Sequence, residues 1–220
     1  GPAGRGTAAW PPAFMLQGAI PVLAVEPLVI VYNTNLVKTP VAGYQDLLKP
    51  EFRGRLGIPE IVATTLVAWY DWLEKTQGAD FLVRLAAQQP RPIVSTPVAA
   101  QSVAAGEIAI HPFVNTGVAM PLIGQGAPMK IVFPNPGFGI RYVGGALGWA
   151  KRPNAAQVFM NYIMSVRGQT AWNGQGDSAS PLPNIPGSLD ARSINPYDPA
   201  PYPPEAVNAY RVKWNALFKK

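Results

Sequence analysis

Residues 29–60 read VIVYNTNLVKTPVAGYQDLLKPEFRGRLGIPE, and this stretch decides the fold. It continues a β-branched and aromatic run, residues 28–32 (LVIVY), which is typical of a buried strand. A turn at Thr39–Pro40, one helical turn at residues 45–48 and a short strand at residues 55–58 follow. Strands and helices in close alternation indicate an α/β architecture with a mostly parallel sheet.

The same alternation extends through the rest of the chain. Leu66, Trp69, Trp72 and Leu73 recur at helical spacing and predict a helix over residues 63–75. Similar patterns predict helices at residues 79–87, 98–105, 153–166 and 204–218, and strands at residues 93–94, 107–110 and 129–133.

Composition excludes several classes of function. The 220 residues carry a net charge of +6 with scattered basic residues, so a nucleic-acid-binding stripe is not indicated. The absence of Cys excludes disulfides and thiolate chemistry, and the single histidine, His111, excludes a two-His zinc site. We expect His111 to be a loop residue with satisfied hydrogen bonds rather than a metal ligand. The apolar residues 19–32 are interrupted by Pro21 and Pro27 and are too short to cross a membrane.

Three segments together resemble one family. They are residues 29–60, residues 94–110 (VSTPVAAQSVAAGEIAI) and residues 144–169 (GGALGWAKRPNAAQVFMNYIMSVRGQ). In this order they are similar to bacterial extracytoplasmic (periplasmic) solute-binding proteins of ABC importers. The resemblance extends over residues 27–175 and is to the branch that includes ferric-iron-, thiamine-, polyamine- and aminoethylphosphonate-binding members.

The resemblance implies an α/β, periplasmic-binding-protein-like (type II) two-lobe fold. Residues 1–33 would form a lead-in and the first crossing strand, and residues 34–128 would form lobe two. Residues 129–220 would supply the return crossing strand (129–134), the remainder of lobe one and the C-terminal helices. Because only 26 residues precede Pro27, we expect lobe one to be incomplete and the chain to be a fragment or a shortened member.

In this family the ligand site is lined by loop tips and helix starts, where free backbone N–H groups hold anions and oxygen atoms. Plain helix capping is the alternative for the hydroxyl and amide residues, hinge packing for Tyr32 and simple solvation for Arg141. The candidate ligand-binding residues are Thr64, Thr65, Ser95, Thr96, Asn115, Thr116, Arg141 and Tyr32.

These residue types favour a small polar or anionic solute. Ferric iron needs phenolate and carboxylate oxygens, and residues 111–118 (HPFVNTGV), where iron-binding relatives have adjacent tyrosines, contain none. Polyamines need facing carboxylates, and Glu26, Glu60 and Asp177 are the only acidic candidates near the expected cleft.

The resemblance therefore implies binding rather than catalysis. A small solute would be captured in an interlobe cleft by hinge closure and delivered to an ABC permease in the inner membrane. We expect a periplasmic monomer, exported by a signal peptide that this sequence does not include, without a cofactor, bound metal or nucleic-acid partner. An α/β enzyme with an interdomain cleft and a binding domain repurposed for signalling are the alternatives.

Overall fold

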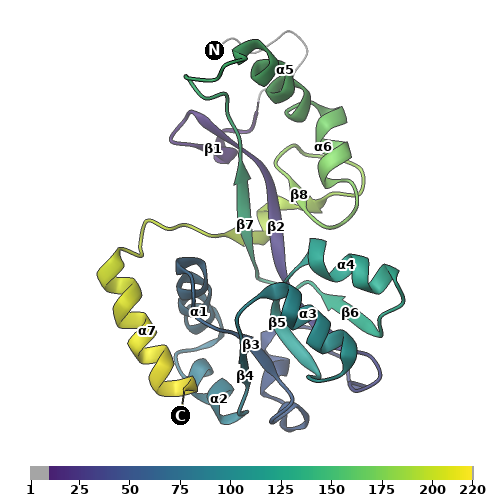
Figure 1. Cartoon of the computed structure of the whole chain (residues 1–220), viewed down its shortest axis with the longest axis vertical. Helices are drawn as coiled ribbons and strands as arrows, with labels where there is room; N and C mark the ends of the chain where they lie inside the picture. The colour runs from purple at the N-terminus through teal and green to yellow at the C-terminus, as the bar shows by residue number, and fades with distance from the viewer. Residues whose placement is uncertain (1–9, 220) are drawn as a thin grey trace. The chain divides into compact units, whose positions relative to one another are not determined.

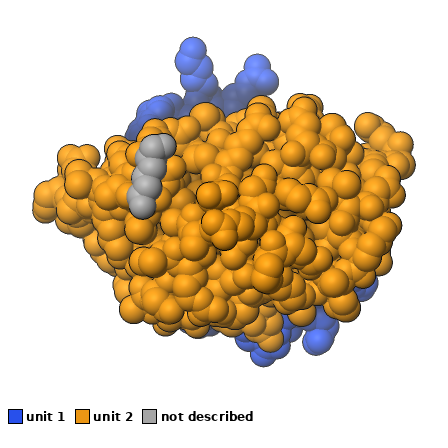
Figure 2. All heavy atoms as spheres, turned by 90° about the horizontal axis from the view of Figure 1, so that it is seen from below, with its two compact units in different colours: residues 1–27, 139–196 blue, residues 28–138, 197–220 orange. Residues whose placement is uncertain are grey.

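The computed structural model describes residues 10–219 and divides into two compact units (Figure 1; Figure 2). Unit 1 comprises residues 1–27 and 139–196, and unit 2 comprises residues 28–138 and 197–220. The chain passes from one unit to the other within β2, again within β7, and finally after β10. Each unit has a hydrophobic core of its own.

The described chain alternates short strands with helices, as expected for an α/β protein. The α-helices are α1 (Thr64–Gln77), α2 (Phe81–Ala87), α3 (Thr96–Ala105), α4 (Thr116–Gly124), α5 (Pro153–Ile163), α6 (Val166–Asn173) and α7 (Pro204–Phe218). The strands are β1 (Met15–Leu16), β2 (Ile20–Asn33), β3 (Gly57–Pro59), β4 (Arg91–Ile93), β5 (Ile110–Asn115), β6 (Met129–Val132), β7 (Gly137–Val143), β8 (Ala179–Ser180), β9 (Leu189–Asp190) and β10 (Ile194–Pro196). Short 3-10 helices are η1 (Pro12–Phe14), η2 (Tyr44–Leu48), η3 (Pro50–Phe52) and η4 (Ala191–Ser193).

Unit 2 is built around one long strand that runs against its neighbours. β2 pairs antiparallel with β5 and with β6, so Val31 faces His111 on one side and Ile131 on the other. β3 and β4 pair in parallel, and a parallel bridge from Leu56 to Ile110 joins the start of β3 to β5. The order across unit 2 is therefore β4-β3-β5-β2-β6, in which β3, β4, β5 and β6 run in the same direction.

Alternate side chains of β5 enter two different parts of the core of unit 2. Val114 packs with Val29, Val31 and residues of α3 in one apolar cluster. Phe113 points the other way, and its ring centroid lies 5.0 Å from that of Trp69 on α1. This two-sided burial follows from the alternation of side chains along a strand, and it explains why β5 is buried from Ile110 to Val114.

Unit 1 consists of the opposite ends of the crossing strands and the helices α5 and α6. β1 and β2 form a hairpin, Val25 of β2 pairs with Ala179 of β8, and β8 pairs in parallel with β9. β7 lies between β2 and β10. Gly139 is required there, because a Cβ at this position would lie 2.7 Å from the carbonyl oxygen of Glu26 and 2.5 Å from Ile194.

The sequence S-x-x-G-Q at residues 165–169 has a structural explanation in unit 1. The Ser165 hydroxyl caps α6 by accepting a hydrogen bond from the amide of Gly168 at 3.1 Å. A Cβ on Gly168 would lie 2.1 Å from the carbonyl oxygen of Tyr162, so only glycine fits. The Gln169 amide is fully buried and donates to the carbonyl oxygens of Leu23 and Ile163 at 3.1 and 2.9 Å. The motif thus fastens α6 to α5 and to β2.

The point at which the chain returns to unit 1 differs from the sequence interpretation. Residues 129–134 were expected to be the crossing strand, but β6 lies wholly within unit 2 and pairs with β2 from Met129 to Val132. β7 makes the crossing, beyond the break at Pro134 and Pro136. An apolar strand such as MKIVF has the same sequence pattern whether it lies within one unit or passes from one unit to the other. The sequence alone therefore did not distinguish these two positions.

The C-terminal helix also packs differently from the interpretation that grouped residues 129–220. α7 forms where the sequence predicts it, but it belongs to unit 2, where it contacts α1 and α2. The ring centroid of Trp214 lies 5.9 Å from that of Tyr70 on α1. A third passage of the chain, after Pro196, brings α7 to this position.

The predicted helix over residues 153–166 is two helices, and only part of its apolar pattern is buried. α5 ends at Ile163, and Ser165 caps the start of α6. Met160 and Ile163 are buried, whereas Phe159 is 58% exposed and Tyr162 43% exposed. The buried face of α5 is thus formed by Met160 and Ile163.

Candidate functional site

Three strand–loop–helix connections meet at one edge of the sheet of unit 2. β3 leads to α1, β4 leads to α3 and β5 leads to α4. Because β4, β3 and β5 are parallel neighbours, their carboxyl ends lie at the same edge, with the helix starts beyond them. Thr64, Thr65, Ser95, Thr96 and Asn115 all belong to these connections. We refer to this region as the helix-start edge.

Helix α1 begins directly at two of the predicted residues. Ala63 is its N-cap residue, so Thr64 and Thr65 are the first two helical residues, whose amide groups have no partner within the helix. Both side chains are half-buried. The Thr65 side chain lies beside the phenol of Tyr197, a residue that the sequence did not point to.

Helices α3 and α4 begin side by side and are joined by a side-chain hydrogen bond. The hydroxyl of Thr96, the first residue of α3, donates to Oδ1 of Asn115, the N-cap residue of α4, at 3.0 Å. This bond confirms that residues 19 positions apart meet at the helix-start edge. Thr116 also lies here, but its side chain is completely buried and its hydroxyl is not presented to solvent.

The expected hydroxyl caps do not form at these helix starts. The N-cap residues of α1, α3 and α4 are Ala63, Ser95 and Asn115, and among the described residues none makes a side-chain capping hydrogen bond. Ser95 is exposed. The capping alternative is therefore wrong for these three helices, although Ser165 does cap α6.

Tyr32 lies far from the helix-start edge along the sheet. Leu28 of β2 pairs with Asn115, whereas Tyr32 pairs with Ile110 at the beginning of β5. At about 3.3 Å per residue, the five residues from Ile110 to Asn115 separate the two places by roughly 15 Å. Because β2 runs against β5, its carboxyl end is at the opposite edge from the helix starts.

Arg141 belongs to unit 1, on β7, and its side chain is half-buried. Its neighbour Tyr142 donates a 2.5 Å hydrogen bond to Oε2 of Glu26, and burial together with this bond raises the pKa of Tyr142 to about 12. One of the carboxylates considered for a cationic ligand is thus engaged by a tyrosine.

His111 lies in β5 rather than in a loop, and it is buried. Its Nδ1 accepts a 3.2 Å hydrogen bond from the amide of Phe113, whereas Nε2 is buried without a hydrogen-bond partner, so the expectation of satisfied hydrogen bonds is wrong for Nε2. Burial lowers the pKa of the imidazole to about 3, because a charged ring would lose its hydration. The neutral ring is packed against Gly57, where a Cβ would lie 2.8 Å from its Cδ2.

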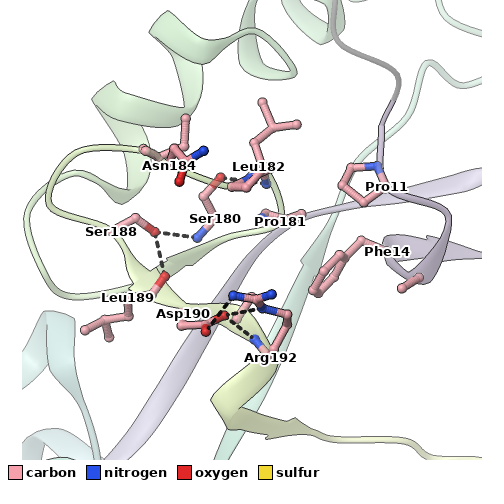
Figure 3. Close-up of a pocket in the computed structure, with 14 residues that line it drawn as sticks. Pro11, Phe14, Ser180, Pro181, Leu182, Asn184, Ser188, Leu189, Asp190 and Arg192 are labelled. Atoms are coloured by element: carbon pink, nitrogen blue, oxygen red, sulfur yellow. Dashed lines mark hydrogen bonds and ion pairs between the residues drawn. The ribbon is translucent and has the colours of Figure 1, made fainter.

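Unit 1 contains a separate pocket of about 540 Å³ (Figure 3). The loop after β8 and the segment around Phe14 form its largely apolar wall. The Ser188 hydroxyl accepts from the Ser180 amide at 2.7 Å and donates to a backbone carbonyl at 2.9 Å. Asp190 and Arg192 form a two-point ion pair at 3.0 and 3.1 Å. These polar groups bind one another, and no predicted site residue lines the pocket.

Residues 10–219 contain no group of three or more His, Cys, Asp or Glu side chains placed to hold a metal ion. No helix in this described part of the chain is long and apolar enough to cross a membrane.

The chain matches one protein family over most of its length. The family model described as bacterial extracellular solute-binding protein matches residues 14–204. A comparison with curated proteins found no match.

Solved structures show the same fold. The chain is similar to the substrate binding protein of an ABC transporter from Agrobacterium tumefaciens, with 17% identity, 97% of this chain and 71% of that chain covered, and a TM-score of 0.73. It is similar to the periplasmic binding protein AfuA from Actinobacillus pleuropneumoniae with exogenous fructose-6-phosphate bound, with 18% identity, 91% of this chain and 68% of that chain covered, and a TM-score of 0.56. It is also similar to the Trichodesmium protein IdiA (FutA) in complex with iron and citrate, with 19% identity, 90% of this chain and 69% of that chain covered, and a TM-score of 0.59.

The expected α/β periplasmic-binding-protein-like fold is confirmed, over about 70% of the length of these solved chains. The family match spans residues 14–204 and includes the three segments on which the resemblance rests. This protein therefore belongs to the bacterial extracellular solute-binding protein family.

Proposed function

We propose that this protein is the solute-capturing component of an ABC importer. It would bind a small polar or anionic solute at the helix-start edge and deliver it to a permease in the inner membrane, acting in the periplasm. Membership of the solute-binding family supports binding as the output. The relative from Agrobacterium tumefaciens is described as the substrate binding protein of an ABC transporter.

The observation that carries the proposal is the convergence of three helix starts at neighbouring strand ends. α1, α3 and α4 each begin there with amide groups that have no partner within their own helix and with the positive end of the helix dipole. Such an arrangement favours phosphate or carboxylate groups. Thr64, Ser95, Thr96 and Asn115 would add hydroxyl and amide hydrogen bonds to the uncharged part of the solute.

An anionic solute fits the surrounding charges better than a diamine. Glu60 forms an ion pair with Lys219, and Glu26 accepts a hydrogen bond from Tyr142, so these two carboxylates already have partners. Two solved relatives hold anionic organic molecules, fructose-6-phosphate in one case and citrate with iron in the other. We extend this ligand class to the present chain as part of the proposal.

Calorimetric titration with inorganic phosphate, fructose 6-phosphate, citrate and putrescine tests the proposal. We expect at least one of the anions to bind with saturation and to raise the melting temperature by mass action. Thr96→Val should weaken that binding, whereas the control Thr76→Val, at the other end of α1, should not. Tight binding of putrescine without binding of any anion would contradict the proposed solute class.

We further propose that Arg141 binds the anionic group of the solute. A planar guanidinium can hold a carboxylate or phosphate with two parallel hydrogen bonds. Arg141→Gln should then weaken anion binding. An unchanged affinity would remove Arg141 from the site.

A further inference from the structure

The loop that precedes α1 is held by residues from the opposite end of the chain. We call residues 60–65 the α1 loop and residues 197–219 the C-terminal segment; both belong to unit 2. Arg211 Nη2 donates to the carbonyl oxygen of Val62 at 3.2 Å. Lys219 forms an ion pair with Glu60. The Tyr197 phenol lies beside the Thr65 side chain, which acts against the burial that raises the pKa of that phenol. The two ends and the middle of the α1 loop thus each lie against the C-terminal segment.

Aromatic packing between α7 and α1 also holds the α1 loop in place. The rings of Trp214 and Phe218 lie 5.9 and 6.1 Å from the ring of Tyr70 on α1, measured between centroids. Tyr70 is completely buried, and its hydroxyl donates to the carbonyl oxygen of Pro59 at 2.6 Å. The end of β3, from which the α1 loop departs, is therefore tied to the helix that α7 covers.

A second set of contacts attaches the C-terminal segment to the body of α1. Tyr202 donates to Asp71 at 2.7 Å, and Tyr210 donates to Glu74 at 2.6 Å. Lys213 forms an ion pair with Glu74 at 2.6 Å. These bonds involve α1 one to three turns beyond the loop, so attachment of the segment and control of the loop depend on different residues.

We propose that the C-terminal segment positions the α1 loop, with Tyr197 and Arg211 as the positioning residues. They set the direction in which the free amide groups of Thr64 and Thr65 point at the helix-start edge. This inference rests on the proposed function, because it assigns these residues a part in solute binding at the same edge. It adds a contribution to solute binding from the C-terminal segment, which is more than 130 positions from the α1 loop in sequence.

The test compares two matched double variants. Tyr197→Phe/Arg211→Met removes one phenol hydroxyl and one cation beside the α1 loop. Tyr202→Phe/Lys213→Met removes one phenol hydroxyl and one cation that contact the body of α1. Backbone hydrogen exchange measured by NMR reports on the loop through the amides of Val62 and Leu66, which are bonded to Glu60 and Ala63.

The amide of Ala99 in α3, bonded to Ser95, serves as the internal reference. We expect about fivefold faster exchange at Val62 and Leu66 in the first variant, as for the loss of about 1 kcal/mol of hydrogen bonding, with no change at Ala99. In the second variant, the exchange rates of Val62 and Leu66 relative to that of Ala99 should be the same as in the wild type. Equal acceleration at all three amides, or none, would overturn the proposal.

Titration with inorganic phosphate separates this inference from the proposed function. Its affinity should fall about fivefold in Tyr197→Phe/Arg211→Met and persist in Tyr202→Phe/Lys213→Met. Unchanged affinity despite faster loop exchange would overturn the positioning role. If neither phosphate nor the other anions bind the wild type, the proposed function is wrong. The positioning role in binding is then wrong as well, whatever the hydrogen exchange of the loop shows.

Discussion

His111 is the single histidine of the chain, and only 1% of it is exposed. Burial lowers its pKa to about 3, because the charged ring would lose its hydration in the core. In the unfolded chain the ring has its ordinary pKa of about 6.5, so protons bind preferentially to the unfolded state below that pH. The contribution of the neutral ring to the free energy of unfolding is fully present above pH 6.5. It is lost progressively as the pH falls from 6.5 to 3. At pH 5 the loss is about 2 kcal/mol.

His111→Asn isolates this contribution. An asparagine carbonyl oxygen can accept the hydrogen bond from the Phe113 amide, and it does not titrate. Urea unfolding at pH 7 and pH 5 should show that the wild type loses about 2 kcal/mol more than the variant. The ring-proton NMR signal of the one histidine gives its pKa directly. Equal losses in both proteins, or a folded-state pKa near 6.5, would refute a buried neutral imidazole.

Three further predictions concern single contacts, each measured by urea unfolding at pH 7. Thr96→Val removes the hydrogen bond to Asn115 and should cost about 1 kcal/mol; no loss would mean that the bond is not formed in solution. Gly168→Ala places a Cβ 2.1 Å from a backbone carbonyl oxygen of α5 and should cost at least about 2 kcal/mol, so a neutral result would contradict the described packing. Gln169→Leu leaves buried backbone carbonyls unpaired and should cost about 2–4 kcal/mol, whereas Gln157→Leu on the surface of α5 should cost little.

The sequence predicted best the elements that have both a strong period and clear ends. α7 forms over the predicted residues, with a proline start and buried Val207 and Trp214. α1 was predicted within two residues at each end. α4 was missed because Pro121 interrupts its interior and glycines stand at both ends, a composition typical of a turn.

Two of the three helix starts of the candidate site, those of α1 and α3, were predictable because hydroxyl residues stand at the beginning of apolar helical patterns. The Ser95–Thr96–Pro97 sequence marks the start of α3, and the structure places Thr96 against Asn115. Tyr32 was misplaced because a strand sequence carries no information about which of its ends shares an edge with its neighbours. That depends on the pairing partner and its direction.

The contribution of the C-terminal segment had no sequence signal. Tyr197 lies in a proline-rich connector, and Arg211 is one of several basic residues near the C-terminus. Their partners, Thr65 and Val62, are brought close only by the third passage of the chain and the packing of Trp214. Contacts of such long sequence separation follow from tertiary packing rather than from local patterns.

An NMR titration of the isotope-labelled protein tests the central claim most directly. With inorganic phosphate, fructose 6-phosphate and citrate as probes, at least one anion should cause saturable shifts of the amide signals at the starts of α1, α3 and α4. Thr64, Thr65, Thr96 and Gly117 should shift together and give one dissociation constant. Shifts confined to residues 180–192 of the unit 1 pocket, or no shifts with any probe, would contradict an anion site at the helix-start edge.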